Sequence, residues 1–568
     1  MRPERLAAIL ALAASAAVTS AGLAERPAGS TFPVSITVDA SRVVGPLRPI
    51  WRYFGADEPN YATMKDGQRL LADMGRLSFG HVYFRAHNLL NTGDGTPALK
   101  WGSTNAYTED ARGNPIYDWR GIDRIFDSYL ARGMKPLVEI GFMPEALSSL
   151  PQPYRHEWRP GLPYSLIFTG WSKPPRDYAR WGELVYQWAK HCVEKYGAEE
   201  VASWWWEVWN EANNLPNGYW GGSAEDFRKL HDFAVAGVRR ALPDARVGGP
   251  HTAGHGGQFM RDFLDHCLHG TNYATGQPGT PLDFVAFHSK GAPVDVGGHV
   301  RMGIAAQLQT VETAFATIAS YPELKGTPVI IGEFDPEGCA ACQGPQLAYR
   351  NGTMYSSYTA AVFARTHDLA ARHRVNLEGA VTWAFTFEDQ PYFAGFRQVA
   401  TNGIPMPVFN VFRMYALMGP ERLRATSSGE AALDAIVKGG VRTTPDVGVL
   451  ASRRQDEVAI MVWHYHDDDV AGPDAAVTID AAGLPGAAAR ASVTHYRIDD
   501  RHSNAYAEWL RMGSPVAPDP AQYAAMQRAS ELGVLEPSPA AVALSDGKAT
   551  VSFTLPRQGV SLLVLRWP

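Results

Sequence analysis

Two glutamates that end apolar, strand-like stretches are the residues of this chain best suited to chemistry. Glu211 follows the tryptophan-rich stretch 204–209, and Glu333 follows the apolar stretch 329–331. A pair of carboxyl groups can cleave a glycosidic bond, because one protonates the leaving oxygen and the other attacks the sugar or activates water. Each glutamate alone could be one of many surface carboxylates. Together, flanked by aromatic residues, they predict a catalytic pair.

The elements that must position this pair alternate along the chain. Apolar strand candidates lie at 51–56, 81–86, 136–141, 204–209, 246–249, 284–288, 329–333 and 380–385. Helical patterns lie between them, at 122–132, 178–196, 224–241 and 355–373. Eight such units predict an α/β fold, a (β/α)8 TIM barrel over residues 50–420. The strand ends of such barrels share one face, so both glutamates are expected at the same opening.

The pattern changes after residue 420. Strand-like segments separated by turn residues occur at 447–452, 458–464, 475–479, 492–498, 549–555 and 561–566. They predict a C-terminal accessory β-sandwich over residues 421–568. The segment 25–49 contains a further strand candidate at 34–38, which is expected to join that sandwich. The stretch 151–175 is rich in Pro, Tyr and Trp and is expected to wall the pocket.

The start of the chain has the composition of a signal peptide. Arg2 and Arg5 precede an Ala- and Leu-rich run that is too short to span a bilayer, and small residues follow it. We therefore predict cleavage of residues 1–24 and a periplasmic or secreted protein without a membrane partner. A membrane anchor at this end is the alternative interpretation.

Charge and cysteine content exclude several functions. The formal charge of the 568 residues is −6, and no basic tract is interleaved with aromatic residues, so nucleic acid is not an expected partner. Cys339 and Cys342 are expected to form a disulfide in an oxidising compartment, with free thiols as the alternative. A zinc site would need two more ligands than this neighbourhood offers. No metal and no cofactor is predicted, and no feature of the sequence indicates an oligomeric state.

Four further side chains at predicted strand ends suit sugar binding. Asn210 precedes Glu211, and Trp383 ends the eighth strand, where its indole could form a floor for a sugar ring. His87 and His288 end the second and sixth strands, where each could bond a hydroxyl group or orient a carboxylate. The alternative for all three aromatic side chains is a structural role.

Four stretches resemble glycoside hydrolase family 39: residues 84–87, 135–144, 206–213 and 331–335. The tail at 496–499 and 502–504 is similar to the accessory β-domain of that family. The resemblance implies that Glu211 is the acid/base, that Glu333 is the nucleophile, and that Asn210 contacts the 2-hydroxyl group of the sugar. It also implies a first sugar subsite, formed by His87, His288, Trp383 and Glu388.

The resemblance leaves several substrates open, because the family includes β-xylosidases, α-L-iduronidases and arabinosidases. An iduronidase must bind a carboxylate, which calls for Arg or Lys. The strand-end motifs have few cations, since Arg85 is expected to be structural and Lys290 is the main exception. We therefore expect a retaining β-xylosidase that acts on xylo-oligosaccharides by double displacement. The alternatives are an arabinosidase or bifunctional enzyme, an iduronidase-like hydrolase, a chitin- or mannan-type relative and a non-catalytic carbohydrate-binding barrel.

Overall fold

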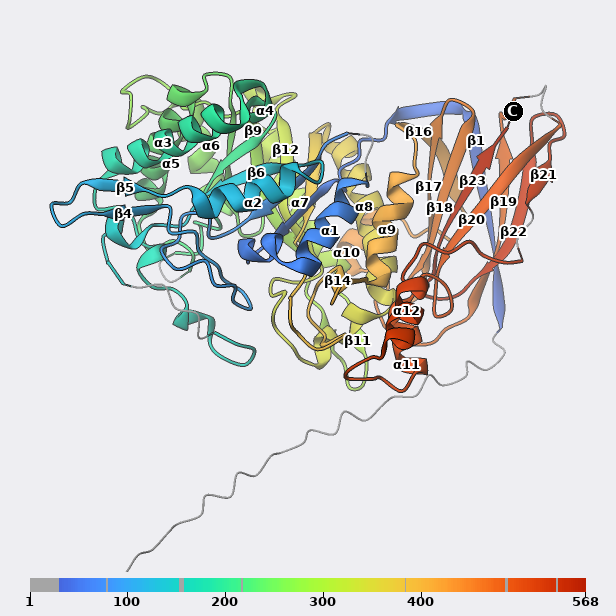
Figure 1. Ribbon diagram of the computed structural model, residues 1–568. Helices are drawn as coiled ribbons and strands as arrows, with labels where there is room; N and C mark the ends of the chain where they lie inside the picture. The colour runs from blue at the N-terminus through green and yellow to red at the C-terminus, as the bar shows by residue number, and fades with distance from the viewer. Residues whose placement is uncertain are drawn as a thin grey trace, which may run out of the picture.

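The computed structural model describes residues 30–77, 80–152, 158–215, 218–383, 385–485, 489–537 and 540–567. Figure 1 shows two bodies packed side by side, a barrel surrounded by helices and a sheet of long strands. The predicted signal peptide lies outside the described residues.

The first body is a closed barrel of eight parallel strands, as predicted. Around the barrel their order is β12, β13, β2, β3, β6, β7, β8 and β9. Their bounds are β2 (Tyr53–Ala56), β3 (Val82–Ala86), β6 (Met134–Ile140), β7 (Trp205–Val208), β8 (Arg246–Thr252), β9 (Phe284–Lys290), β12 (Pro328–Asp335) and β13 (Asn376–Thr382). Nearly all of these strand residues are buried, which explains why the strands are apolar runs rather than alternating ones.

Helices and short elements surround the barrel. The α-helices are α1 (Lys65–Gly75), α2 (Arg120–Leu130), α3 (Tyr178–Tyr196), α4 (Ala198–Ala202), α5 (Ala224–Ala241), α6 (Gly257–His269), α7 (Ile304–Ala319), α8 (Thr353–His373) and α9 (Pro407–Ala416). Short 3₁₀ helices are η1 (Pro59–Thr63), η2 (Glu145–Leu147), η3 (Tyr164–Leu166), η4 (Gly170–Ser172), η5 (Pro322–Leu324) and η6 (Pro345–Asn351). Two-stranded hairpins are β4 (Tyr107–Glu109) with β5 (Pro115–Tyr117), β10 (Val294–Asp295) with β11 (Val300–Arg301), and β14 (Ala400–Thr401) with β15 (Ile404–Pro405).

The second body is a nine-stranded, mostly antiparallel sheet. Its order is β21, β20, β23, β18, β17, β16, β1, β19 and β22. The bounds are β1 (Thr31–Pro46), β16 (Glu421–Ser427), β17 (Asp446–Arg454), β18 (Glu457–Tyr465), β19 (Asp474–Ala482), β20 (Arg490–Ile498), β21 (Ala541–Ala543), β22 (Ala549–Leu555) and β23 (Val560–Arg566). Strand β1 pairs antiparallel with β16 and parallel with β19. The edge strands β21 and β22 approach each other, so the two predicted sandwich layers belong to one curled sheet. Connecting helices are α10 (Leu433–Gly439), α11 (Ala505–Arg511) and α12 (Pro520–Ala529).

Helix α8 joins the two bodies and is buried along most of its length. Its Arg365 donates to both carboxylate oxygens of Asp446 on β17, at 2.7 and 2.9 Å. Tyr358 of the same helix packs edge-on against Tyr465 on β18. The domain boundaries drawn from the sequence remain predictions, although the barrel strands all lie before Trp383 and eight of the nine strands of the sheet lie after Pro420.

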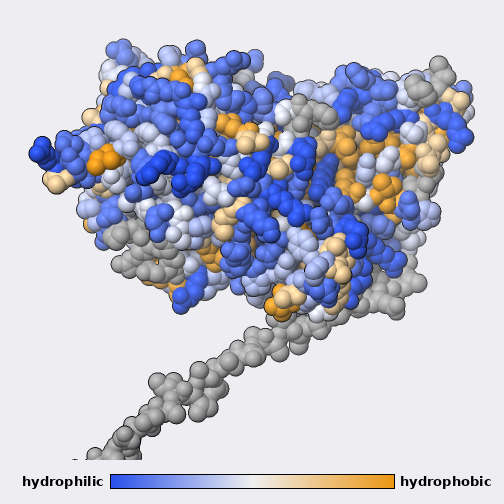
Figure 2. All heavy atoms as spheres, viewed as in Figure 1, coloured by the Kyte–Doolittle hydropathy of each residue, from blue (hydrophilic) through white to orange (hydrophobic). Residues whose placement is uncertain are grey.

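The face of the molecule in Figure 2 is mostly hydrophilic over the barrel, whereas hydrophobic residues gather over the strands of the C-terminal sheet. None of the helices in the described residues is long and apolar enough to cross a membrane.

Two layers of side chains fill the barrel interior. Tyr83, Leu137 and Trp205 belong to an apolar cluster near the beginnings of the strands. Two positions further along the same strands, on the same face, stand Arg85, Glu139 and Glu207, all fully buried. The barrel therefore places a charged layer directly beneath the opening where the strands end.

Candidate active site

Glu211 and Glu333 meet at the carboxyl ends of the barrel strands. Glu333 lies on β12 and is 6% exposed, while Glu211 follows β7 and is half-buried. A carboxylate oxygen of one lies within 4.8 Å of a carboxylate oxygen of the other. The backbone around Glu211 is strained, because Trp209 and Glu211 both have positive φ, 69° and 45°. Strain of this kind persists where surrounding structure holds it, and it is concentrated at functional sites.

Positive charge surrounds Glu333. Lys290 lies 2.7 Å from its Oε2, and Arg85 donates from Nη1 to its Oε1 at 3.1 Å. The Nε2 atom of His87 is 3.4 Å from the same oxygen. Burial alone would raise the pKa of Glu333, but Lys290, His288, His87 and Arg85 together outweigh it and hold the pKa well below its usual range. These neighbours therefore favour the ionised carboxylate of Glu333.

Glu211 has different neighbours. His288 Nδ1 lies 2.9 Å from its Oε1, and Asn214 donates to its Oε2 at 3.3 Å. The adjacent Asn210 accepts from Arg85 Nη2 at 3.0 Å through its side-chain oxygen. Its side-chain nitrogen is buried and has no hydrogen-bond partner among the described residues. That nitrogen is therefore available to donate to a hydroxyl group of a bound sugar.

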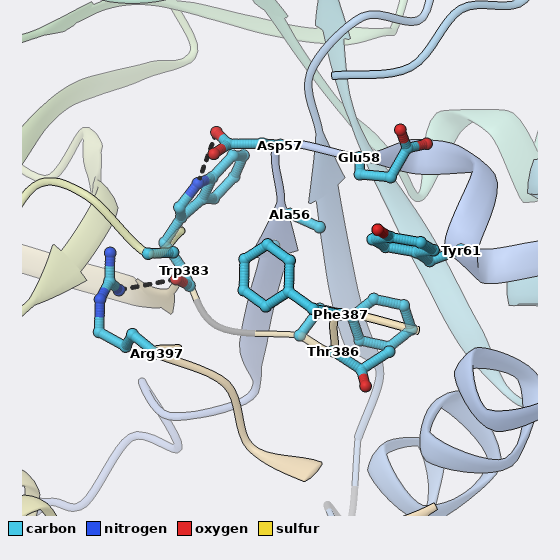
Figure 3. A pocket seen from close by; sticks show the side chains of 11 residues that line it. Ala56, Asp57, Glu58, Tyr61, Trp383, Thr386, Phe387 and Arg397 are labelled. Atoms are coloured by element: carbon cyan, nitrogen blue, oxygen red, sulfur yellow. Dashed lines mark hydrogen bonds between the residues drawn. The ribbon is translucent and has the colours of Figure 1, made fainter. Parts of the chain in front are cut away.

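Hydrogen bonds, as well as packing, hold Trp383 in place. Its indole N–H donates to Asp57 at 3.0 Å, and its carbonyl accepts from Arg397 at 2.7 Å, as Figure 3 shows. Asp57 also accepts from Lys100 at 2.6 Å. Asp57 follows strand β2 and was not among the predicted site residues, although its position after the first barrel strand is equivalent to theirs.

An aromatic wall stands beside His87. Its imidazole lies 4.4 Å from the Trp383 ring and 5.5 Å from that of Phe142. Behind Phe142 stands Trp171, 4.6 Å away between ring centroids. Trp171 belongs to the stretch 151–175, whose residues 153–157 lie outside the described part of the chain. The half-buried ring of Tyr219 completes the wall, 5.9 Å from both His87 and Phe142.

The structure places Glu388 at the N-terminus of α1. Its two carboxylate oxygens accept from the backbone N–H groups of Asp66 and Gly67, at 2.8 and 2.9 Å. A carboxylate at this position stabilises the helix by satisfying its unpaired donors and complementing its dipole. The substrate-binding role expected for Glu388 remains a prediction.

The charged layer contains residues that the motifs did not indicate. Arg85 Nη2 lies 2.8 Å from Glu139, and His87 Nδ1 lies 2.6 Å from the same carboxylate oxygen. Burial would lower the pKa of His87, but the Glu139 carboxylate outweighs it and raises that pKa to about 9. A further pair, Glu207 and His251, lies beneath Asn210. A glutamate inside an apolar strand was the available signal for both Glu139 and Glu207.

The loop after β12 is fastened to the site by a second ionic network. Cys339 and Cys342 form a disulfide, as expected. Glu337 accepts from Arg397 at 2.6 Å and lies 2.7 Å from Arg350. Arg397 in turn lies 2.5 Å from Asp335, two residues after Glu333. The loop is thus connected to the strand that carries Glu333.

Metal-ligating side chains gather at one point of the described chain, where Glu211, His288 and Glu333 meet. Lys290 and Arg85 already supply positive charge to Glu333, which disfavours a cation there. The absence of a metal cofactor remains a prediction.

The chain is similar to known proteins in both sequence and structure. The sequence profile of Glycosyl hydrolases family 39 matches residues 34–543. A β-xylosidase of Caldicellulosiruptor saccharolyticus is 25% identical over 509 residues, which cover 88% of this chain and 92% of that protein. The human α-L-iduronidase is 27% identical over 579 residues, covering 95% and 79% of the two chains. A solved structure of a bacterial orthologue of human α-L-iduronidase superposes with a TM-score of 0.72 at 21% identity, covering 94% of this chain and 84% of that one.

Proposed function

The chain belongs to glycosyl hydrolase family 39, and we propose that it is a retaining glycosidase that releases a neutral pentose, with β-xylosidase as its main activity. The short distance between Glu211 and Glu333 carries this proposal. Retaining glycosidases place the two carboxyl groups about 5–5.5 Å apart, whereas inverting enzymes separate them by about 6.5–9.5 Å to leave room for water. Oxygen atoms within 4.8 Å of each other support the retaining arrangement.

The reaction has two steps. In the first, a Glu333 oxygen attacks the anomeric carbon, the bond to the leaving oxygen breaks, and Glu211 gives its proton to that oxygen. In the second, Glu211 takes a proton from water, whose oxygen attacks the same carbon and releases Glu333. The cations around Glu333 keep it ionised for the first step, and Asn210 is placed to hold a hydroxyl group beside the reacting carbon.

The cations near the site are already paired, which favours an uncharged sugar. Lys290 forms an ion pair with Glu333, and Lys100 forms one with Asp57. Arg85 is surrounded by carboxylates. Arg397 lies between Asp335 and Glu337. A substrate carboxylate would have to compete with these acidic partners for each cation. Curated relatives include both β-xylosidases and α-L-iduronidases, so charge rather than similarity supports the choice.

We expect an aryl β-xyloside to be hydrolysed at least about tenfold faster in kcat/KM than the matching aryl β-glucoside, with some activity on aryl α-L-arabinosides. A glucoside carries an extra hydroxymethyl group, and the aromatic wall of Phe142, Trp171 and Tyr219 restricts the space for it; steric exclusion can exceed the roughly 1–3 kcal/mol of a single lost contact. A parallel screen that includes an aryl α-L-iduronide measures this preference. Equal rates on xyloside and glucoside, or preference for the iduronide, would overturn the pentosidase proposal alone. A dominant rate on the arabinoside would assign the second candidate activity.

We also propose export, based on the sequence of residues 1–24. Expression of the full chain in a Gram-negative host should give a mature protein that begins near residue 25, found in the periplasm or medium. N-terminal sequencing of the fractionated protein checks this. A cytoplasmic protein that retains residues 1–24 would refute it.

A further inference from the structure

Glu207 lies beneath the site and is linked through one guanidinium to Glu333 and to Asn210, the neighbour of Glu211 in the chain. Arg85 Nε donates to Glu207 Oε1, while its Nη1 donates to Glu333 and its Nη2 to Asn210. Glu207 is fully buried on β7 and pairs in register with Glu139 on β6. A shift of Glu207 would therefore move the group that holds the nucleophile.

His251 on β8 contacts the backbone of Glu211, the residue that carries the other carboxylate. Its carbonyl oxygen accepts from the backbone N–H of Glu211 at 2.9 Å. The strand register shifts at His251, and the residue has a φ of 48°, so a bulge turns it toward β7. Its ring lies 5.6 Å from that of His288, which contacts Glu211.

The His251 ring also fixes the strand that carries Glu333. A Cβ atom at Gly332 would lie only 2.1 Å from His251 Nδ1, so only glycine leaves room for the ring. The register between β12 and β9 shifts at the same point. His251 therefore touches the backbone on both sides of the site.

Glu207 and His251 face each other directly, with Glu207 Oε2 in contact with His251 Nε2. Both atoms are buried and neither has another hydrogen-bond partner among the described residues, so a proton shared between them would satisfy both. Burial raises the pKa of Glu207 to about 7, despite the opposing charge of Arg85. Burial, together with the charges of Arg85 and His288, lowers the pKa of His251 well below its usual range. Both shifts favour the proton on Glu207 rather than on His251.

We propose that Glu207 and His251 form a proton-sharing positioning pair that sets the relative geometry of the two catalytic carboxylates. The pair touches no reacting atom. Its carboxyl side holds Arg85, which contacts Glu333 and Asn210. Its imidazole packs against Gly332 beside Glu333, and the backbone carbonyl of the same histidine accepts from the Glu211 N–H. A neutral Glu207 also leaves the Arg85 charge available to Glu333 and Glu139. The proposal rests on the catalytic roles proposed for Glu211 and Glu333.

The first test compares two substitutions at Glu207. Glu207→Gln keeps the shape, an acceptor for Arg85 and a donor for His251, so we expect kcat within about fivefold of wild type. Glu207→Ala removes all three, and misplacement of catalytic groups by about 1 Å can cost about 10²-fold, so kcat should fall about 100-fold with KM nearly unchanged. Rescue by glutamine distinguishes positioning by a neutral group from a need for negative charge. Equal losses in both variants, or no loss in a folded Glu207→Ala protein, would overturn the proposal.

Asp446 provides the matched control. It is also a fully buried carboxylate paired with a buried arginine, Arg365, but it lies in the C-terminal sheet. Asp446→Ala should lower Tm while leaving kcat within about twofold, since it is remote from the site.

The second test is a double-mutant cycle between the pair. His251→Asn removes the ring but suits the left-handed backbone, because asparagine tolerates positive φ. If the two residues act as one unit, the Glu207→Ala/His251→Asn protein should lose no more kcat than the worse single variant. His251→Asn combined with Asp446→Ala should instead give the product of the two separate effects. Multiplicative losses for the first pair would refute a shared role.

The closing test needs no substrate and follows the proton itself. Groups facing Glu207 come from several elements, namely Arg85 and His87 from β3 and its end, Glu139 from β6, His251 from β8 and His288 from β9. The pKa of Glu207 is about 7 in the folded protein, whereas the ordinary pKa of an unfolded glutamate is about 4.3. Between these two pH values the unfolded chain binds fewer protons at Glu207 than the folded protein does. The free energy of unfolding of the wild type therefore falls as pH rises through this range.

Glu207→Gln has no proton to lose. Its Tm relative to wild type should therefore rise between about pH 5 and about pH 8, measured by calorimetry at both values. A pH-independent difference would show that Glu207 does not hold the proton and would refute the shared-proton pair. A wild type that hydrolyses none of the glycosides would refute the proposed function instead, and it would leave this measurement unaffected.

Discussion

Glu333→Ala is expected to lower kcat for an aryl β-xyloside by at least about 10⁴-fold, because it removes the carboxylate proposed to form the covalent intermediate. Glu333 is the carboxylate on which Lys290 and Arg85 converge, and its pKa is held well below the usual range. Removal of this carboxylate leaves those cations facing an empty site rather than a nucleophile. Steady-state kinetics, with circular dichroism to confirm folding, measures the effect.

The control for this substitution is Glu378→Ala. Glu378 also lies on a barrel strand and pairs with an arginine, Arg52, at 2.5 Å. It stands near the start of β13, so it is at the opposite end of the barrel from the site. The kcat of the Glu378→Ala variant should stay within about threefold of wild type. A Glu333→Ala protein that keeps more than about 1% of wild-type kcat would contradict the nucleophile role.

A 2-deoxy-2-fluoro xyloside with a good leaving group provides an independent check on the same residue. The fluorine slows both steps, and the good leaving group restores only the first, so the covalent intermediate accumulates. Mass spectrometry should find one sugar per chain of wild type, on the peptide that contains Glu333. Labelling at any other carboxylate would reassign the nucleophile.

The barrel could be predicted from the sequence because its strands are buried on both faces. Each of the eight appears as a short apolar run followed by polar residues, and the helices between them carry their own signals, such as the capping box formed by Ser223 and Asp226 at the start of α5. The proximity of Glu211 and Glu333 followed from the same rule, since the two residues end two of those runs, and their catalytic roles are proposals.

The supporting residues could not be predicted in the same way, because their roles arise from pairing between strands. Arg85 was expected to be structural, yet it contacts Glu333 as well as Glu139 and Glu207. No local pattern relates residues on β3, β6 and β7 until the barrel closes and fixes their register. The bulge at His251 is invisible in the sequence for the same reason, because it is defined only by the neighbouring strand.

The pairing of charges around the site could not be predicted from local sequence patterns either. The sequence suggested a site with few cations, whereas the structure brings Arg85, Lys100, Lys290 and Arg397 close to it. Each of these cations forms an ion pair with a carboxylate from a different part of the chain. The expectation of a neutral sugar therefore remains, but its physical reason changes from a lack of cations to their compensation.

Glu211→Ala is expected to have an effect that depends on the leaving group. For a xylo-oligosaccharide, whose leaving oxygen must be protonated, kcat/KM should fall by about 10²–10⁴-fold, the usual contribution of a general acid. For a dinitrophenyl xyloside, which departs without a proton, the first step should be nearly unaffected, and hydrolysis of the intermediate should become rate-limiting because no base activates water. Azide needs no base, so it should accelerate that substrate at least about tenfold and yield the β-xylosyl azide, since it enters from the face that Glu211 has vacated. Glu378→Ala should show neither the leaving-group dependence nor the azide effect. An α-azide product would contradict the acid/base role, because azide would then have entered from the face opposite to Glu211. Equal losses on both substrates without azide rescue would show that the roles of Glu211 and Glu333 are wrongly assigned.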